Sequence, residues 1–216
     1  MHIEPGFVAP AKVILANVAI IGVLGYYARH MLFKPTVWLR AGLAALFFSL
    51  FMQSFHMPVG PSELHFVGAM AMYLLLGFVP TLFGFAVGLL LQGMLFNPGD
   101  LYHLAVNSLS LIIPLIVVHK TLGRTFSGDV TCLRWSTILK LDAMYYAGMS
   151  IIVGFWLVIG EVATPFSAWA AWASSYLAIV AFEPLFTYGA SRLLGRYRDN
   201  RWLAICFAIE PAKATS

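Results

Sequence analysis

Long runs of apolar residues, separated by short polar segments, dominate the pattern of this chain. The runs lack the strict alternation of half-buried β-strands, and most approach the roughly 20 apolar residues that a helix needs to cross a bilayer. The pattern therefore predicts about seven helical segments of spanning or near-spanning length. Their expected ranges are 13–28, 39–55, two segments within 64–96, 103–119, 136–160 and 168–194.

The run from 64 to 96 is too long for a single crossing. Gly77-Phe78-Val79-Pro80 in its middle favours a tight turn, which would divide the run into a hairpin of two rather short helices. The prediction is an all-α polytopic bundle, with residues 1–216 forming one integral membrane domain. Residues 1–12 would precede the helices of 13–194, and residues 195–216 would form a polar tail.

The composition supports a membrane protein and excludes several other classes. Hydrophobic residues make up 61% of the chain and charged residues 10%, and the mean hydropathy is +0.85, far outside the range of a soluble domain. The net charge of +4 does not indicate a nucleic-acid partner, because the basic residues sit in short loops rather than on one face. No G-x-x-x-x-G-K-[ST] motif is present, so energy for any pumping must come from another chain.

The distribution of basic residues predicts the orientation in the membrane. Three groups flank the predicted spans: Arg29, Lys34 and Arg40; Lys120, Arg124, Arg134 and Lys140; and Arg192, Arg196, Arg198 and Arg201. The positive-inside rule makes these regions cytoplasmic, and the odd number of spans then places the N-terminus outside. We expect a multi-pass protein of a bacterial inner membrane, with the tail of residues 195–216 in the cytoplasm.

The predicted outer side is acidic. It carries Glu4, Glu63, Asp100 and Glu161, with Lys12 as its one basic residue. An acidic surface raises the local concentration of cations, although acids also simply occupy loops from which bases are excluded. Cys132 and Cys206 are far apart and lack the spacing of a zinc site, so both are expected to be unpaired thiols.

Met1-His2 offers three nitrogen ligands to one transition-metal ion. These are the α-amine of Met1, the backbone nitrogen of His2 once it is deprotonated, and the near ring nitrogen of His2. A nitrogen-only square favours Ni(II) or Cu(II), with Co(II) possible, over Mg or Ca. A fourth nitrogen must come from elsewhere, and a histidine at position two also arises by chance.

The remaining histidines divide by their predicted side of the membrane. His30 and His119 adjoin basic residues on the cytoplasmic side and are expected to be interfacial snorkelling residues. Those near the outer side are His56, His65 and His103. His65 opens the third predicted span, and Gly68 would let another backbone approach the same face. This placement suits a ligand that points into the bundle, or equally a structural imidazole bonded to a carbonyl.

Four motifs resemble, in order, signatures of the CbiM/NikM family. They are Met1-His2-Ile3-x-x-Gly6-Phe7, Ser62-x-x-His65-x-x-Gly68, Asn107, and Glu183-x-x-x-Thr187. The family comprises membrane-embedded, substrate-binding components of energy-coupling-factor cobalt and nickel transporters. The resemblance implies that Met1, His2 and His65 hold Ni(II) or Co(II) and that the N-terminal segment folds into the bundle from outside. It further implies a transmembrane coupling subunit and ATPase subunits as partners, and no catalytic residues.

The sequence departs from the family pattern at two places. Glu4-Pro5 inverts the usual order of proline and acid, and Ser110 stands where a second asparagine is common, so details around the ligands are open.

Four further residues are candidates near the ion path. Asn107 would orient an imidazole or bridge helices, and His103, one helical turn earlier, would orient a ligand or accept the ion in transit. His56 is an additional transit candidate. Glu183, inside the last apolar run, would support partner coupling or cap a helix broken at Pro184.

Two alternatives are open on the sequence alone. One is a membrane enzyme or electron carrier that uses His65 and His103 as haem or metal ligands. The other is an assembly subunit without an ion, in which the histidines are structural. Nickel and cobalt are not separated by the sequence, because both accept the same nitrogen ligands.

Overall fold

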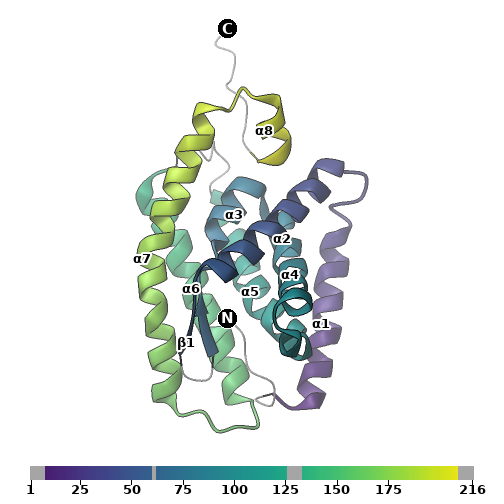
Figure 1. The fold of residues 1–216 in the computed structure, drawn as a ribbon, viewed down its shortest axis with the longest axis vertical. Helices are drawn as coiled ribbons and strands as arrows, with labels where there is room; N and C mark the ends of the chain where they lie inside the picture. The colour runs from purple at the N-terminus through teal and green to yellow at the C-terminus, as the bar shows by residue number, and fades with distance from the viewer. Residues whose placement is uncertain (1–7, 60–61, 126–132, 209–216) are drawn as a thin grey trace.

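The computed structural model describes residues 8–59, 62–125 and 133–208, and helices dominate it (Figure 1). Within those residues, six helical segments are long and apolar enough to cross a membrane. They are α1 (Pro10–Ala28), α2 (Pro35–Ser54), α4 (Phe78–Leu95), the 3-10 helix η1 (Pro98–His103) continued by α5 (Leu104–Lys120), α6 (Trp135–Val158) and α7 (Phe166–Arg196). The shorter elements are β1 (His56–Val59), β2 (Ser62–His65), α3 (Ala69–Leu76), η2 (Leu122–Thr125) and α8 (Arg201–Cys206).

The predicted all-α membrane bundle is confirmed, and the predicted single spans agree with the helices to within a few residues. Prolines account for three of the starts, because Pro10, Pro35 and Pro98 stand in the first turn of α1, α2 and η1, where no backbone N–H is required. The outward sides of the long helices are apolar. Ile14 on α1 is 64% exposed and Ile151 on α6 is 65% exposed, as expected for side chains in contact with lipid.

Two helices do lie within 64–96, but the expectation that the first has near-spanning length and starts near residue 64 is wrong. Residues up to His65 form β2, and α3 has 8 residues, a length of about 12 Å against a hydrocarbon core of about 30 Å. Gly77, with φ 99°, ends α3, and Phe78–Pro80 form the first turn of α4 rather than a loop. Only α4 therefore has the length of a span.

Gly68 produces the change from strand to helix. Its φ of 64° lies in the left-handed region, and a Cβ there would stand 2.4 Å from Cδ2 of Phe51. A side chain at this position would be strained and would also collide. The close neighbour is an aromatic side chain, not the backbone that we expected from the sequence.

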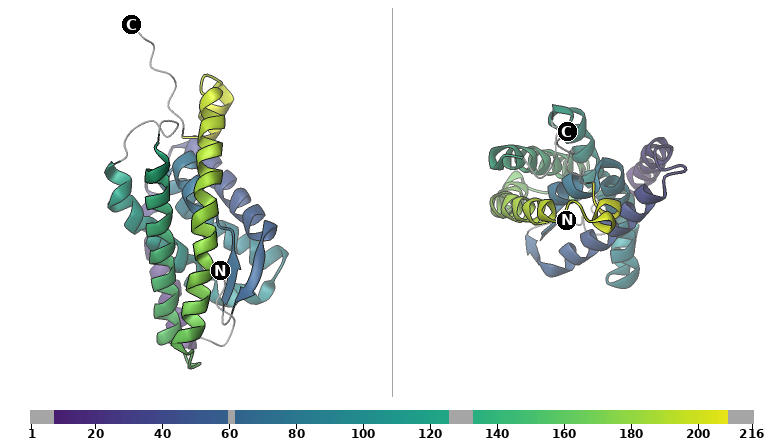
Figure 2. Two further views of the ribbon diagram at one scale, coloured as in Figure 1. Left: turned by 90° about the vertical axis from the view of Figure 1, so that its left-hand side faces the viewer. Right: turned by 90° about the horizontal axis from the view of Figure 1, so that it is seen from above.

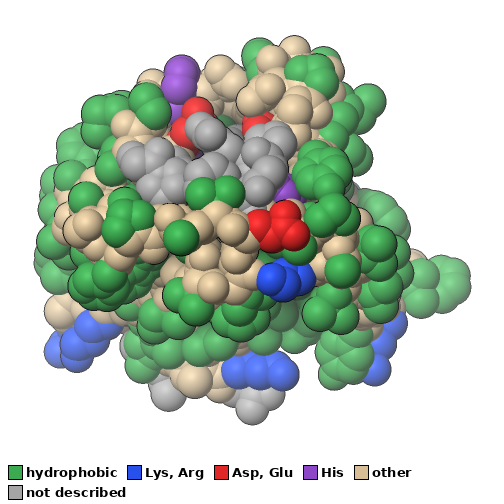
Figure 3. Space-filling view, turned by 90° about the horizontal axis from the view of Figure 1, so that it is seen from below, with side chains coloured by type: hydrophobic (Ala, Val, Ile, Leu, Met, Phe, Trp, Pro, Cys, Tyr) green, Lys and Arg blue, Asp and Glu red, His purple; other side chains and the backbone are tan. Residues whose placement is uncertain are grey.

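The strand and short helix together still carry the chain from one end of the bundle to the other. The six spanning helices and this discontinuous segment make seven passages, so the start of α1 and the end of α7 lie at opposite ends (Figures 1 and 2). We call the end with the α1–α2 connection, the α4 start and α8 the basic end, since Arg29, Lys34 and Lys120 lie there. The opposite end, with the β1–β2 hairpin, is the acidic end. Figure 3 shows that acidic and histidine side chains gather on it.

Helix α4 lies very close to α2. A Cβ on Gly84 would be 2.4 Å from the Cβ of Ala44, and one on Gly88 would be 2.5 Å from Cδ1 of Phe48. Two small residues one turn apart allow two membrane helices to pack with few voids. This contact fixes the position of α2, and α2 leads directly into β1 of the hairpin.

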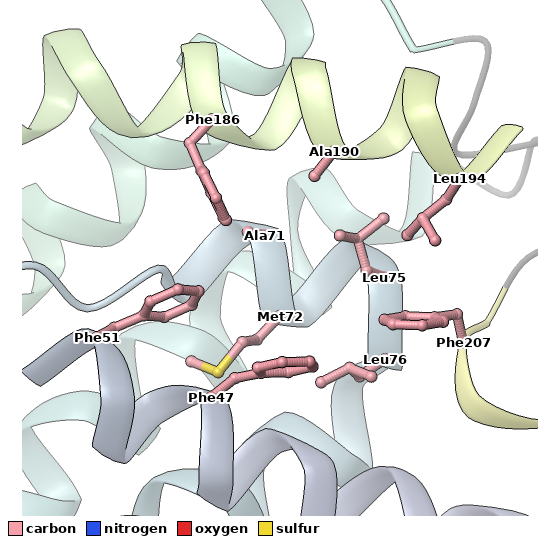
Figure 4. A pocket seen from close by; sticks show the side chains of 10 residues that line it. All are labelled: Phe47, Phe51, Ala71, Met72, Leu75, Leu76, Phe186, Ala190, Leu194 and Phe207. Carbon is pink, nitrogen blue, oxygen red and sulfur yellow. The ribbon is translucent and has the colours of Figure 1, made fainter. Parts of the chain in front are cut away.

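Helix α3 is enclosed by α2, α7 and the segment after α8. All eight of its residues are buried. Figure 4 shows Phe47 of α2, Phe186 of α7 and Phe207 directed toward it around an apolar cavity of about 170 Å³. The guanidinium of Arg40 donates to the carbonyls of residues 204, 205 and 207, which ties α8 to α2 beside the end of α3.

Candidate metal site

His65 lies on β2 near the acidic end, and its side chain is buried. This corrects the expectation that His65 opens a helix. Its Nδ1 is 3.3 Å from the carbonyl oxygen of Met52, and its Nε2 is 2.9 Å from Oε2 of Glu63. A carbonyl oxygen only accepts, so Nδ1 carries a proton and donates to Met52. The Nε2 nitrogen, which meets the Glu63 carboxylate, is then the one suited to bind a metal.

Two aromatic residues of α7 hold the strand that carries His65. The indole of Trp172 donates to the carbonyl of Glu63 at 3.4 Å. The hydroxyl of Tyr176 donates to the same carbonyl and accepts from the backbone N–H of His65, each at 3.5 Å. Both aromatic side chains are buried. The orientation of His65 therefore depends on α7 as well as on the hairpin.

His56 faces His65 across the hairpin. The two residues are paired in the antiparallel register, and their rings are stacked with centroids 6.2 Å apart. His65 is buried while His56 is exposed. The hairpin thus places a surface imidazole directly beside the buried one, and His56 stays a candidate for ion transit.

His103 and Asn107 lie on a different wall, at the end of η1 and in α5. Both are buried, and the ring of His103 contacts that of Tyr102 with centroids 5.0 Å apart. Ser110, about one helical turn beyond Asn107, donates to the carbonyl of Val106 at 2.9 Å. The Ser110 hydroxyl is thus used within its own helix.

Met1 and His2, with Glu4 and Pro5, lie outside the described residues. Val8, the first residue that the structure describes, is 2% exposed and belongs to the hydrophobic core. Within residues 8–59, 62–125 and 133–208, no group of three or more His, Cys, Asp or Glu side chains is arranged to hold a metal ion.

Glu183 caps the N-terminus of α3. Its side chain is fully buried, Oε1 accepts from the backbone N–H of Met70 at 3.0 Å, and Oε2 accepts from the hydroxyl of Tyr146. A carboxylate at a helix N-terminus interacts favourably with the helix dipole. The alternative of a helix broken at Pro184 is wrong, because α7, which has 31 residues, runs without interruption through Pro184.

Asp142 of α6 lies beside Glu183 in the same buried cluster. Among the described residues, neither of its carboxyl oxygens has a hydrogen-bond partner. Two carboxyl groups side by side in a buried site are unfavourable when both are ionised, so at least one of them carries a proton. The cluster links α3, α6 and α7. Tyr146, which donates to Glu183, stacks on Tyr176 with ring centroids 5.3 Å apart.

Two features of the sequence could have indicated these buried residues. Asp142 lies inside the predicted span 136–160, where an ionisable residue is expensive unless it is paired. The buried residues of α7 recur at helical spacing and include Trp172, Tyr176, Ile179, Glu183 and Thr187. That stripe indicates the face of α7 that meets the strand and α3.

His119 lies half-buried at the basic end, and two neighbours hold its ring. Its Nδ1 is 3.1 Å from the hydroxyl of Tyr73, and its ring stacks on Phe78 with centroids 3.9 Å apart. His30 is exposed at the basic end and contacts the carbonyl of Tyr27. Cys206 is a free thiol, as predicted, and Cys132 lies outside the described residues.

Replacing Glu183 with alanine should destabilise the bundle by about 3 kcal/mol, because buried donors at the start of α3 would lose their acceptor. Glu183→Gln keeps one carbonyl oxygen and should lose less. Unfolding in mixed micelles measures both effects. Glu161→Gln, which removes an exposed carboxylate, is the control. Equal stability of Glu183→Ala and the native chain would contradict the capping role.

The chain is similar to a protein family and to solved structures over most of its length. The family model for CbiM, described as the cobalt uptake substrate-specific transmembrane region, matches residues 2–201. A crystal structure of a transition metal transporter is similar with a TM-score of 0.75 and 20% identity, covering 94% of this chain and 96% of the other. A truncated transition metal transporter gives 0.67 and 20%, covering 91% and 97%. No curated protein sequence matches significantly.

Proposed function

The chain belongs to the CbiM family of cobalt-uptake substrate-specific membrane components, and we propose that it captures Ni(II) or Co(II) through Met1, His2 and His65. The ion would be bound by the Met1 amine, the backbone and ring nitrogens of His2, and Nε2 of His65. Four nitrogens complete the square that suits these ions. The coarser function, uptake of a cobalt- or nickel-type metal ion by a membrane component, follows from the family.

The observation that carries this proposal is the environment of His65. Its ring is buried, and Met52 and Glu63 engage both of its nitrogens at defined positions. In metal-binding imidazoles the N–H of the second ring nitrogen commonly donates a hydrogen bond to a carbonyl, which fixes the ring orientation and the tautomer. Met52 supplies that carbonyl. The burial of Val8 supports an N-terminal segment that reaches the interior from the same end.

Glu63 would act as an exchangeable partner of His65. The Met52 carbonyl and an ionised Glu63 carboxylate can only accept hydrogen bonds. Both contacts are therefore satisfied when the imidazole of His65 carries a proton on each ring nitrogen. Binding of the ion to Nε2 would displace one proton and release the Glu63 carboxylate. The freed carboxylate would then help to balance the charge of the ion.

Transport would require other chains. The described residues form the membrane bundle and its short connections, and the sequence contains no P-loop for ATP hydrolysis. We propose a transmembrane coupling subunit and ATPase subunits as partners in a bacterial inner membrane. The basic end would face the cytoplasm and the acidic end the source of the ion.

Titration of the purified protein with Ni(II) and Co(II), with the native N-terminus intact, tests the proposal. We expect one ion per chain and proton release on binding. Affinity should fall more than about tenfold between pH 7.5 and pH 6, because amine and imidazole nitrogens must be deprotonated to bind. Calorimetry in two buffers of different ionisation enthalpy measures both quantities.

Two outcomes of this titration would favour the alternatives. The absence of binding at neutral pH would favour an assembly subunit with structural histidines. A visible haem absorption band, insensitive to the N-terminal amine, would favour an electron carrier that uses His65 and His103.

A further inference from the structure

A cavity of about 480 Å³ lies at the basic end, between the end of α1, the start of α2, the start of α4 and the end of α5. Helix α1 packs on α5 and diverges from α2, as the upper right of Figure 1 shows. The cavity lies in the space between these diverging helices. It is remote from His65, which lies on the hairpin at the opposite end.

The lining of this cavity is strongly basic. Lys34, Arg40 and Lys120 contribute to it, and none of the described residues that line it is acidic. Neither lysine forms an ion pair with a described carboxylate. Arg40 is hydrogen-bonded to three backbone carbonyls, which orient its guanidinium, and no carboxylate in the part of the chain that the structure describes pairs with it. Three cations around one cavity favour an anion.

Polar and aromatic groups complete the wall. His30 and Tyr27 line one side, and His119, stacked on Phe78, lines the other. The first turn of α4 begins in this wall without a side-chain cap, so its backbone N–H groups add to the positive potential. The charged side chains and the backbone therefore act in the same direction.

The loop beside the cavity points to a membrane lipid as the source of the anion. Phe33, next to Lys34, is 99% exposed and has a φ of 61°, a conformation that is unfavourable for a bulky residue. Leu32 and Trp38 are also exposed. Apolar and aromatic side chains next to lysine are typical of the headgroup region of a bilayer. The mouth of the cavity thus lies at headgroup depth.

We propose that this cavity binds the phosphate of an anionic phospholipid headgroup. Lys34 and Lys120 contact the phosphate oxygens, Arg40 supplies further positive charge, and the exposed loop residues Leu32 and Phe33 lie among the acyl chains. Basic pockets between membrane helices are known to take such headgroups. A lipid bound here would brace α1 against α2 and α4, where protein contacts are sparse.

Thermal unfolding in detergent, with added phosphatidylglycerol or phosphatidylcholine, tests this site. We expect phosphatidylglycerol to raise the unfolding temperature of the native chain more than phosphatidylcholine does. The variant Lys34→Gln/Lys120→Gln should lose that difference, with an affinity for phosphatidylglycerol at least about tenfold weaker. Both lysines are exposed, so the fold should persist; if it does not, the single variant Lys120→Gln serves. Native mass spectrometry counts the retained lipids.

Arg192→Gln/Arg196→Gln is the matched control, since it removes two charges from exposed positions on α7 outside the cavity. It should keep the full response to phosphatidylglycerol. A separate arm with inorganic phosphate distinguishes the sources: stabilisation by phosphate alone, equal to that by lipid, would overturn a lipid site in favour of a soluble anion. If both double variants lost the response to phosphatidylglycerol to the same extent, general charge attraction would explain it and no site would be needed. If a soluble acidic peptide, added in place of lipid, raised the unfolding temperature of the native chain while phosphatidylglycerol did not, the cavity would be assigned to a protein partner instead.

Discussion

Extending the chain by a few residues ahead of Met1 is expected to abolish high-affinity binding of Ni(II) and Co(II). The extension converts the α-amine of Met1 into an amide and moves His2 away from the second position. Both fused chelate rings are then lost, and only isolated imidazoles remain for the ion. We expect an affinity loss of at least about a hundredfold, since removing even a neighbour of a metal ligand costs roughly ten- to a hundredfold.

The matched control carries the same residues at the C-terminus, after Ser216. It should bind the ion as the native chain does, because α8, which the tail follows in the chain, lies at the basic end. Calorimetric titration of the two extended proteins compares them directly. Unchanged affinity in the N-terminally extended protein would refute the chelate and leave His2 as an incidental residue.

Replacement of His65 by alanine should have the second largest effect, also at least about a hundredfold in Ni(II) affinity. The imidazole is buried and directed by Met52, and the carboxylate of Glu63 beside Nε2 would offer an oxygen in place of the nitrogen that completes the square. The exposed His56 stacks on the ring but lies on the solvent side of it. Binding and stability are measured on the same preparation, which separates the loss of a ligand from the loss of the strand.

His30→Ala provides the control for His65→Ala. His30 lies at the basic end, contacts Tyr27 and is remote from the hairpin. Its replacement should leave the affinity for Ni(II) close to the native value. If His65→Ala bound the ion as tightly as His30→Ala, the fourth nitrogen would have to come from another residue.

The membrane bundle could be predicted from the sequence because hydrophobic length is a local property. Each long apolar run, such as 136–160, is decided by its own residues and by the thickness of the bilayer. The region from His56 to Gly77 could not be predicted in this way. It is short, broken by Pro58 and by Gly68, and its strands and helix are stable only because α2, α6 and α7 surround them.

The candidate site was predicted in part. His65 was selected for its side of the membrane and for its motif, and the structure adds why its ring is oriented: a carbonyl from α2 and two aromatic residues from α7 hold it. The sequence indicates Glu183 because a carboxylate inside a membrane span is energetically costly. The sequence does not indicate that the backbone N–H of Met70 is its partner. Met70 is more than a hundred residues away in the chain, and no local pattern connects them.

The sequence by itself determined that this chain is a helical membrane protein, the ranges of most spans, the charge difference between its ends, and a histidine pattern suited to nickel or cobalt. These follow from apolar length, charge and residue type, which act locally. The tertiary structure alone decided that His65 lies on a strand, that Glu183 caps α3 beside Asp142, and that three cations surround one cavity. Such contacts join residues distant in sequence, because a buried polar group must find its partner wherever the fold provides one.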